Sequence, residues 1–228
     1  MNTAVGVLDS ATIQTLEVEK PEKIVIRKID KPKTKLAYKC AKRIIDFLAS
    51  LIGSIILIIP MIVIAVIIKL DSKGPVFYKQ ERLGEDGKPF MLYKFRSMRV
   101  DAEANGAQWA TDHDERCTKV GAVLRLYRLD ELPQIPFNIL PGTLSIVGPR
   151  PERKVFYDKF ATYIDGFEQR LYVKPGLTGL AQVSGGYDLL PEEKIVYDLE
   201  YIENRSLKMD IGIIFKTIAV IFDHEGAR

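Results

Sequence analysis

The chain has 228 residues, of which 47% are hydrophobic, so it is long enough to bury a sizeable core. Its 33 basic and 30 acidic residues give a formal net charge of +3 and no strong global field. The basic residues are scattered and no recognition motif accompanies them, so no nucleic acid is indicated as a partner. Two cysteines, Cys40 and Cys117, lack the spacing of a metal site or a disulfide framework, which favours a reducing, cytosol-facing environment.

The N-terminal segment, residues 1–38, is predicted to be a basic tail. Residues 1–30 lack the apolar stretch of a secretory signal, and the apolar run at 23–27 indicates one edge strand at most. Six lysine and arginine residues then lie between residues 31 and 43. Beside a membrane segment, such a cluster favours anionic lipid on the cytoplasmic face.

Residues 39–73 are predicted to anchor the chain in a membrane. From Phe47 to Ile68 the chain has about 22 residues without a charge, which as a straight helix would measure about 33 Å and cross a bilayer core. Pro60 interrupts this run and favours a kink. Both flanks are basic, and the positive-inside rule favours such flanks on the cytoplasmic side. A kinked re-entrant helix satisfies both observations and a spanning helix leaves one flank outside, but the residues alone leave both topologies open.

From residue 74 onward the composition is that of a soluble α/β region. Apolar and aromatic runs at 76–80 and 90–95 flank a Gly-Glu-Asp-Gly turn, which predicts a β-hairpin. Lys94 and Arg96 lie at its end and belong either to an anion site or to a solvated basic edge. Residues 101–118 are polar and indicate a loop or a short helix. This segment holds Trp109, a candidate either for an interface anchor or for simple local packing, and His113, which a polar loop explains better than a metal site does.

Two adjacent carboxylates, Asp130 and Glu131, end a short helix predicted over residues 119–132. Pro133 follows them, and because a residue before proline avoids the α region, the pair is expected where the helix ends or bends. Adjacent carboxylates can divide the roles of nucleophile and metal ligand. An ordinary exposed pair is the simpler explanation of these residues taken alone.

The C-terminal third is predicted to be mainly helical. Residues 152–171 carry four apolar residues on roughly one helical face, which indicates core or interface, and residues 174–186 are predicted to be a glycine-punctuated loop. A helix is expected to begin near Pro191, with Asp198 on its polar face. The apolar segment from about 211 to 222 is too short to span a bilayer and predicts an interfacial or core helix.

Several motifs occur in a fixed order along the chain. They are Lys-Arg-Ile-Ile-Asp at 42–46, Gly-Pro-Val-Phe at 74–77, Lys-Gln-Glu-Arg at 79–82, Tyr-Lys-Phe-Arg-Ser-Met at 93–98, Leu-Asp-Glu-Leu-Pro-Gln at 129–134, Val-Gly-Pro-Arg-Pro at 147–151 and Lys-Pro-Gly-Leu-Thr-Gly-Leu-Ala-Gln-Val at 174–183. Together they resemble the bacterial monotopic phosphoglycosyl transferases, the sugar transferases that begin glycan assembly on polyprenyl phosphate. The resemblance covers about residues 39–222 and suggests a minimal catalytic-domain form.

This resemblance implies a two-step transfer of a phosphosugar from a UDP-sugar to polyprenyl (undecaprenyl) phosphate, with release of UMP. It is the first membrane step of exopolysaccharide, capsule or glycoconjugate assembly. Asp130 matches the nucleophile that would form a covalent aspartyl-phosphosugar intermediate, and Glu131 matches the residue that positions magnesium. The remaining implied contacts to substrate or phosphate are Arg125, Arg150, Lys94, Arg96 and Asp198.

The fold that the resemblance implies is α+β and mainly helical. A re-entrant membrane helix kinked near Pro60, a β-hairpin and interfacial amphipathic helices would surround a compact active site. Residues 74–228 would form the catalytic region at the cytoplasmic face of the inner (plasma) membrane. Membrane lipid, downstream glycosyltransferases and a second copy in a homodimer are the implied partners.

The chain departs from the family pattern at three places. Ile59-Pro60 replaces the usual Ser-Pro, Gly142-Thr143-Leu144-Ser145 replaces Gly-Asp-Met-Ser, and the segment from 134 to 142 is one residue longer, with an extra Pro136. These changes lie near the expected site without touching the acidic pair. A membrane-anchored nucleotide-diphosphate hydrolase and an inactive assembly scaffold are the alternative functions.

Overall fold

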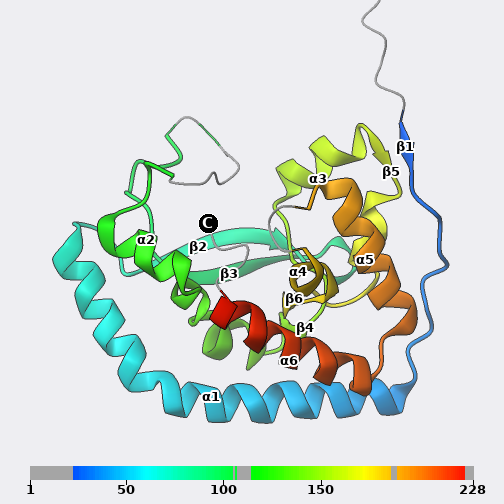
Figure 1. Ribbon diagram of the computed structural model, residues 1–228, viewed down its shortest axis with the longest axis horizontal. Coiled ribbons are helices and arrows are strands. Elements are labelled where there is room, and N and C mark those ends of the chain that lie inside the picture. The colour runs from blue at the N-terminus through cyan, green and yellow to red at the C-terminus, as the bar shows by residue number, and fades with distance from the viewer. Residues whose placement is uncertain (1–22, 105, 107–113, 186–188, 224–228) are drawn as a thin grey trace, which may run out of the picture.

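The structure is a computed structural model that describes residues 23–104, 106, 114–185 and 189–223. Trp109 and His113 lie outside the described residues, so what was expected of them stays a prediction. The described chain is mainly helical and contains three separate two-stranded sheets. Figure 1 shows one long helix, α1, along one side of the molecule, with the other elements gathered against it.

Helix α1 runs from Leu36 to Asp71 and contains Pro60. Proline removes one helical hydrogen bond and favours a kink, and Figure 1 shows α1 changing direction partway along its length. Two serine hydroxyls also bond back to helix carbonyls: Ser50 donates to Phe47 at 3.0 Å and Ser54 donates to Ser50 at 2.6 Å. Such back-bonding often bends helices. Ser50 and Ser54 therefore favour bending of α1, although the residue directly before Pro60 is Ile59 and not a serine.

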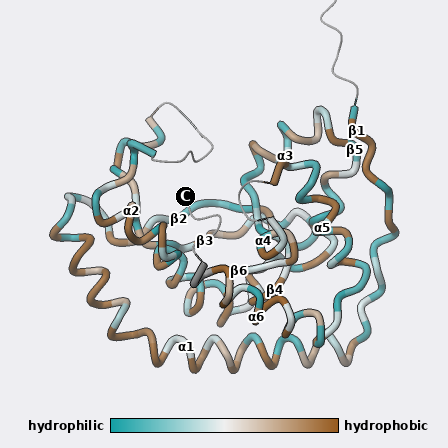
Figure 2. The backbone as a smooth tube through the Cα atoms, viewed as in Figure 1, coloured by the Kyte–Doolittle hydropathy of each residue, from teal (hydrophilic) through white to brown (hydrophobic). Residues whose placement is uncertain are grey.

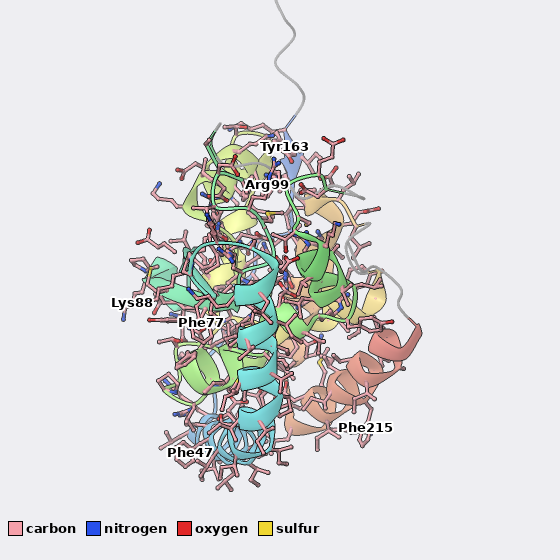
Figure 3. All side chains as sticks on the ribbon, turned by 90° about the vertical axis from the view of Figure 1, so that its left-hand side faces the viewer. Phe47, Phe77, Lys88, Arg99, Tyr163 and Phe215 are labelled. Carbon is pink, nitrogen blue, oxygen red and sulfur yellow. The ribbon has the colours of Figure 1, made fainter. Side chains whose placement is uncertain are left out.

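The surface of α1 is apolar and exposed. Among the described residues it is the one helix that is long and apolar enough to cross a membrane, and only 6% of its most apolar window is buried. The brown tube in Figure 2 follows most of its length. A helix in the core of a soluble protein would be buried, so this exposure indicates a surface for lipid or for another protein. Figure 3 shows Phe47 of α1 and Phe215 of helix α6 (Leu207–Asp223) at the end of the molecule opposite Tyr163.

The hairpin expected around the Gly-Glu-Asp-Gly turn is present. Strand β2 (Phe77–Leu83) pairs antiparallel with β3 (Pro89–Phe95), in a register that sets Phe77 opposite Phe95 and Leu83 opposite Pro89. The turn between them holds the short 3₁₀ helix η2 (Glu85–Gly87), in which Asp86 has a φ of 60°. The hairpin carries Lys94 and Arg96 at its end, beside the cleft described below.

Two parallel strand pairs lie elsewhere in the fold. Strand β4 (Ser145–Val147) pairs with β6 (Gly176–Thr178), and β1 (Ile24–Val25) pairs with β5 (Ile164–Asp165). The pair β1–β5 joins a segment near the N-terminus to the middle of the chain.

The remaining helices cover these strands. They are α2 (Lys119–Leu126), the 3₁₀ helix η3 (Leu129–Glu131), the π-helix η4 (Ile135–Ile139), α3 (Lys154–Ala161), the 3₁₀ helix η5 (Phe167–Tyr172), α4 (Leu180–Ser184), α5 (Pro191–Asn204) and α6. Helix α5 begins at Pro191 as predicted, and Glu193 accepts a hydrogen bond from the Leu190 N–H at 2.7 Å. The main core packs side chains from α3, η5, α5 and α6; its most deeply buried members include Ile164, Phe167, Ile195 and Ile202.

The single helical face predicted over residues 152–171 is wrong. Helix α3 ends at Ala161, strand β5 follows, and Gly166 with a φ of 95° turns the chain into η5. Phe160 and Phe167 are nevertheless buried in the main core, so the core explanation of the apolar stripe is confirmed. The apolar spacing predicts one helix because it carries no signal of the left-handed turn at Gly166.

The loop predicted over residues 174–186 is also wrong, because it contains β6 and α4. The glycines there allow two backbones to approach closely. A Cβ atom on Gly176 would lie 2.1 Å from the amide nitrogen of Gly148. Glycine is therefore required for the pairing that places the Gly-Pro-Arg-Pro segment beside the cleft.

Candidate active site

The acidic pair lies in η3, directly after α2. Thr118 caps α2 by accepting the Gly121 N–H at 2.9 Å, and Arg128, in a left-handed conformation with a φ of 54°, separates α2 from η3. Asp130 and Glu131 are 7% and 8% exposed. The exposed-pair explanation is therefore wrong, and the pair does lie at a bend as predicted.

Basic side chains from two other segments meet the pair. Glu131 Oε1 accepts hydrogen bonds from Lys94 Nζ at 2.7 Å and from Arg150 Nη2 at 2.6 Å. Lys94 Nζ also lies 3.5 Å from Asp130 Oδ2. Buried carboxylates need such partners, because an unpaired buried charge is costly.

The two carboxyl groups differ in their expected ionisation. Burial raises the pKa of Asp130 and the charge of Glu131 raises it further, while Lys94 opposes both. Burial also opposes the ionisation of Glu131, but Arg150 and Lys94 outweigh it and hold the pKa of Glu131 well below its usual range. Neighbouring groups with diverging pKa values often mark a functional site.

The pair opens into a cleft with a volume of about 470 Å³. This size suits a small-molecule ligand. Of the described residues that line the cleft, eleven are basic and four are acidic. The basic ones are Arg82, Lys94, Arg96, Arg99, Arg116, Arg125, Arg128, Arg150, Arg153, Arg170 and Lys194. A lining with this excess of positive charge favours an anionic ligand such as a diphosphate.

The structure brings most of the predicted site residues together. Lys94, Asp130, Glu131 and Arg150 are in direct contact, and Arg125 lines the same cleft.

Arg96 also lines the cleft but is only 5% exposed. Its guanidinium donates to the backbone oxygens of Ser72 and Lys73 at 2.8 and 2.6 Å, which ties β3 to the end of α1. The prediction that Arg96 belongs to a solvated basic edge is therefore wrong.

Asp198 lies behind the cleft and is 1% exposed, so its placement on a polar helix face is wrong. It accepts a hydrogen bond from Arg170 Nε at 2.5 Å, and Arg170 lines the cleft. Arg170 Nη2 in turn donates to the backbone oxygen of Arg150 at 3.0 Å. Asp198 therefore reaches the site through Arg170.

Arg170 and Arg82 are cleft residues that the sequence did not single out. Arg82 donates to Pro151 O at 3.2 Å and to Glu152 Oε2 at 3.0 Å, so it supports the segment that carries Arg150. In the sequence, Arg170 is marked only by its place inside an apolar stripe, and Arg82 only by its place at the end of the Lys-Gln-Glu-Arg motif. Neither identifies a partner distant in sequence.

The acidic pair also fits a magnesium site of a particular kind. Among the described residues, no group of three or more His, Cys, Asp or Glu side chains is placed to hold a metal. Magnesium is commonly bound by one or two carboxylates, with water and substrate phosphate completing the coordination. Asp130 and Glu131 supply such carboxylates, so the donor set fits a magnesium ion that is shared with a phosphate ligand.

Comparison with known proteins gives a consistent result. The sequence model described as bacterial sugar transferase matches residues 37–224. The chain is 45% identical over 194 residues to the UDP-N-acetylgalactosamine-undecaprenyl-phosphate N-acetylgalactosaminephosphotransferase of Aeromonas hydrophila, covering 84% of this chain and 46% of that protein. It is 46% identical over 173 residues to the UDP-glucose:undecaprenyl-phosphate glucose-1-phosphate transferase of Xanthomonas campestris pv. campestris, covering 73% and 36%.

A third relative, the UDP-glucose:undecaprenyl-phosphate glucose-1-phosphate transferase of Caulobacter vibrioides, is 34% identical over 201 residues, covering 86% of this chain and 75% of that protein. The chain thus spans less than half the length of the first two relatives. The matched region contains the acidic pair, its basic partners and nearly all of α1. The chain belongs to the bacterial sugar transferase family.

Proposed function

We propose that this chain is a membrane-associated phosphoglycosyl transferase that moves a phosphosugar from a UDP-sugar to undecaprenyl phosphate and releases UMP. The observation that carries the proposal is a buried Asp-Glu pair in a strongly basic cleft, on a chain whose longest helix is apolar and exposed. The names of the relatives support it, since each name describes the transfer of a sugar phosphate to undecaprenyl phosphate. Those names differ in the sugar, so the proposal leaves the sugar open.

Asp130 is proposed as the nucleophile of the first step. One carboxylate oxygen attacks the phosphorus bonded to the sugar, the bond from that phosphorus to the bridging oxygen breaks, and UMP leaves with the bridging oxygen. The product is an aspartyl-phosphosugar intermediate. Attack requires the ionised carboxylate, and Lys94 favours that form.

The second step restores the enzyme. A phosphate oxygen of undecaprenyl phosphate attacks the same phosphorus, and the bond to Asp130 breaks, so the carboxylate returns and the diphosphate-linked sugar lipid forms. No net proton transfer is required. Arg150 and Lys94 are proposed to bind phosphate oxygens, because their donors already converge on the neighbouring Glu131.

Magnesium is proposed as the cofactor, with Glu131 as its main protein ligand. When bound, it would neutralise diphosphate charge that otherwise repels an anionic nucleophile. Glu131 suits this role because Arg150 and Lys94 hold its pKa below its usual range, which keeps it ionised.

We also propose a location for the reaction. The exposed apolar surface of α1 would lie in the membrane as a re-entrant helix, with the cleft at the cytoplasmic face of the inner membrane. One substrate is soluble and the other is embedded in lipid, so a shallow anchor would let both reach Asp130. Assembly into a homodimer and hand-over to downstream glycosyltransferases remain part of the proposal.

The proposal is tested by incubating the purified chain in nanodiscs with UDP-sugars, magnesium and undecaprenyl phosphate. We expect continuous UMP release with at least one donor, dependent on undecaprenyl phosphate. UMP release at the full rate without the lipid would instead indicate a nucleotide-diphosphate hydrolase. Absence of UMP with every common donor would contradict the transferase and favour an inactive scaffold.

Asp130→Asn is expected to abolish the covalent phosphosugar adduct, because the amide keeps the shape of the side chain but is a poor nucleophile. Intact-mass spectrometry after mixing with a labelled UDP-sugar, without lipid acceptor, measures the adduct. Asp101→Asn is the control, since Asp101 is 73% exposed and does not line the cleft. An adduct that persists in Asp130→Asn would refute the assignment of the nucleophile.

A further inference from the structure

Residues 23–35, called here the N-terminal strap, lie outside the region matched by the family. In Figure 1 this blue segment runs along the outside of the molecule from β1 to the start of α1. The sequence predicted a basic tail here. None of its residues lines the cleft, so any effect of the strap on the cleft has to act through other residues.

The first part of the strap is built into the fold by strand pairing and burial. Ile24 N–H donates to Tyr163 O at 2.8 Å and Ile26 N–H donates to Asp165 O at 3.1 Å. The Ile26 side chain is 8% exposed and belongs to the main core, together with Phe167 of η5. A tail would bury no such side chain, so this part of the strap is a folded segment that pairs with β5 and packs against η5.

Gln169 connects the strap to η5. Its Oε1 accepts the Ile29 N–H at 2.6 Å, and its Nε2 donates to Arg27 O at 3.2 Å and to Gly166 O at 3.0 Å. The side chain is 2% exposed. Without the strap, this buried amide would lose two of its three partners, which is costly for a buried polar group.

The residue that follows Gln169 is Arg170, which lines the cleft. Its Nη2 donates to the backbone oxygen of Arg150, whose own guanidinium bonds to Glu131 at 2.6 Å. The strap, η5, Arg170 and Arg150 therefore form one continuous set of packed and hydrogen-bonded contacts. It ends at the acidic pair.

We propose that the strap is a positioning element for the part of the cleft around Arg170 and Arg150, and that Ile26 of the strap and Gln169 of η5 are the positioning residues. They act by holding η5 so that Arg170 and the backbone of Arg150 keep the geometry needed to bind a nucleoside diphosphate. This inference rests on the proposed function, because it assumes that the cleft takes UDP. A purely stabilising strap would alter the melting temperature without altering the affinity for UDP.

The last residue of β1 and the residue after it offer a matched pair of positions. Val25 is 72% exposed and Ile26 is 8% exposed, although they are adjacent in the chain. The full-length chain in nanodiscs is prepared as Ile26→Ala and Ile26→Asp, with Val25→Ala and Val25→Asp as controls and Ile26→Val as the conservative variant. Calorimetry with UDP and magnesium measures Kd, and hydrogen exchange reports the protection of η5.

The Ile26→Ala and Ile26→Asp variants are expected to raise the Kd for UDP by about fivefold or more, since small displacements remote from the reacting atoms can have large effects. Exchange in η5 should increase in parallel. The donor KM should rise more than kcat falls, because the contacts of Asp130 do not include the strap. The Val25 variants and Ile26→Val should stay within about twofold of the wild type.

An unchanged UDP Kd in the folded Ile26→Ala variant would overturn the proposal, whether or not exchange in η5 rises. Equal losses in the Val25 variants would also overturn it, because the effect would then not depend on burial of Ile26. Ile26→Ala decides the test if Ile26→Asp fails to fold. A wild-type chain that does not bind UDP would contradict both this inference and the proposed function, whereas wild-type binding with unaffected Ile26 variants contradicts this inference alone.

Discussion

At the scale of single residues, the two adjacent carboxylates acquire different properties from their surroundings. Glu131 accepts hydrogen bonds from Lys94 and Arg150, while Lys94 Nζ lies 3.5 Å from Asp130 Oδ2. Burial therefore dominates the pKa of Asp130 and the basic neighbours dominate that of Glu131. This asymmetry suits one nucleophile and one permanently charged metal ligand.

Lys94→Met is expected to move the acid limb of the rate–pH profile to higher pH. Burial already raises the pKa of Asp130, and Lys94 is the neighbour that lowers it most, so removing the ammonium group raises that pKa further. As pH falls, Asp130 then becomes protonated sooner and loses its nucleophilic form. Initial rates of UMP release across pH measure the limb.

Lys79→Met is the control for this shift. Lys79 lies on the neighbouring strand, with its Nζ 5.1 Å from the centre of the Tyr93 ring, and it does not line the cleft. Its profile should match the wild type. A limb that stays in place in Lys94→Met would contradict the role of Lys94, even if the overall rate falls.

Glu131→Gln is expected to raise the magnesium concentration for half-maximal turnover by about tenfold or more, as loss of a group that supports a metal site commonly does. The amide keeps the size of the side chain and removes the charge. Magnesium titrations of UMP release measure the effect, with Glu203→Gln as a control because Glu203 pairs with Arg27 outside the cleft. An unchanged magnesium response would argue against Glu131 as the ligand.

At the scale of elements, α1 is joined to the strand that leads into the site. Asp46 of α1 accepts the Ser145 hydroxyl at 2.7 Å and the Ile146 N–H at 3.2 Å, and it is 4% exposed. Arg43, one turn earlier, donates to the backbone oxygens of Ile139 and Leu140 at 3.0 and 2.7 Å. Helix α1 is thus fixed by polar contacts both to β4 and to the end of η4.

Asp46→Ala is expected to destabilise the fold by about 1–3 kcal/mol, because the buried Ser145 hydroxyl and the part-buried Ile146 N–H lose their acceptor. Chemical denaturation in detergent micelles measures the loss. Asp158→Ala is the control, since Asp158 is 61% exposed in an ion pair with Lys154, and it should change stability by less than about 0.5 kcal/mol. Equal effects of the two variants would contradict the structural role of Asp46.

At the scale of the whole molecule, the proposed placement at a membrane has to accommodate both the exposed apolar surface of α1 and the basic cleft. The bend of α1 visible in Figure 1 allows the helix to enter and leave on the same side. Arg96 also holds the end of α1 against β3, so the helix end is fixed beside the cleft. A spanning helix would instead place its two ends on opposite sides of the bilayer.

Single-cysteine labelling distinguishes the two topologies. Cys40 precedes the apolar run and is exposed, so Cys117→Ser leaves one reporter, and Lys73→Cys in a chain lacking both native cysteines gives the other. A membrane-impermeant maleimide should label both in inverted vesicles and neither in spheroplasts. Lys159→Cys in the same cysteine-free chain reports the side of the catalytic region. Labelling of the two flanks from opposite sides would contradict re-entry.

Local patterns in the sequence account for the features that depend on neighbours in the chain. The uncharged run, the turn of the hairpin and the start of α5 at Pro191 each follow from a few adjacent residues. The acidic pair was expected at a bend because Pro133 restricts the residue before it, but Leu132 adopts the α region and the break lies at Arg128, which has a φ of 54°. The roles expected for the two carboxylates came from the ordered motifs, since an adjacent acidic pair by itself also occurs on many protein surfaces without a catalytic role.

The sequence by itself therefore determined the long apolar helix, the hairpin and the family, because these are encoded in composition, short-range spacing and ordered motifs. Only the tertiary structure decided that Asp130 and Glu131 are buried, that Asp198 reaches the cleft through Arg170, and that the N-terminal strap bonds to Gln169, the residue before that arginine. Each of these depends on contacts between residues distant in sequence. Burial and pairing arise from the packing of the whole chain, which no local pattern reports.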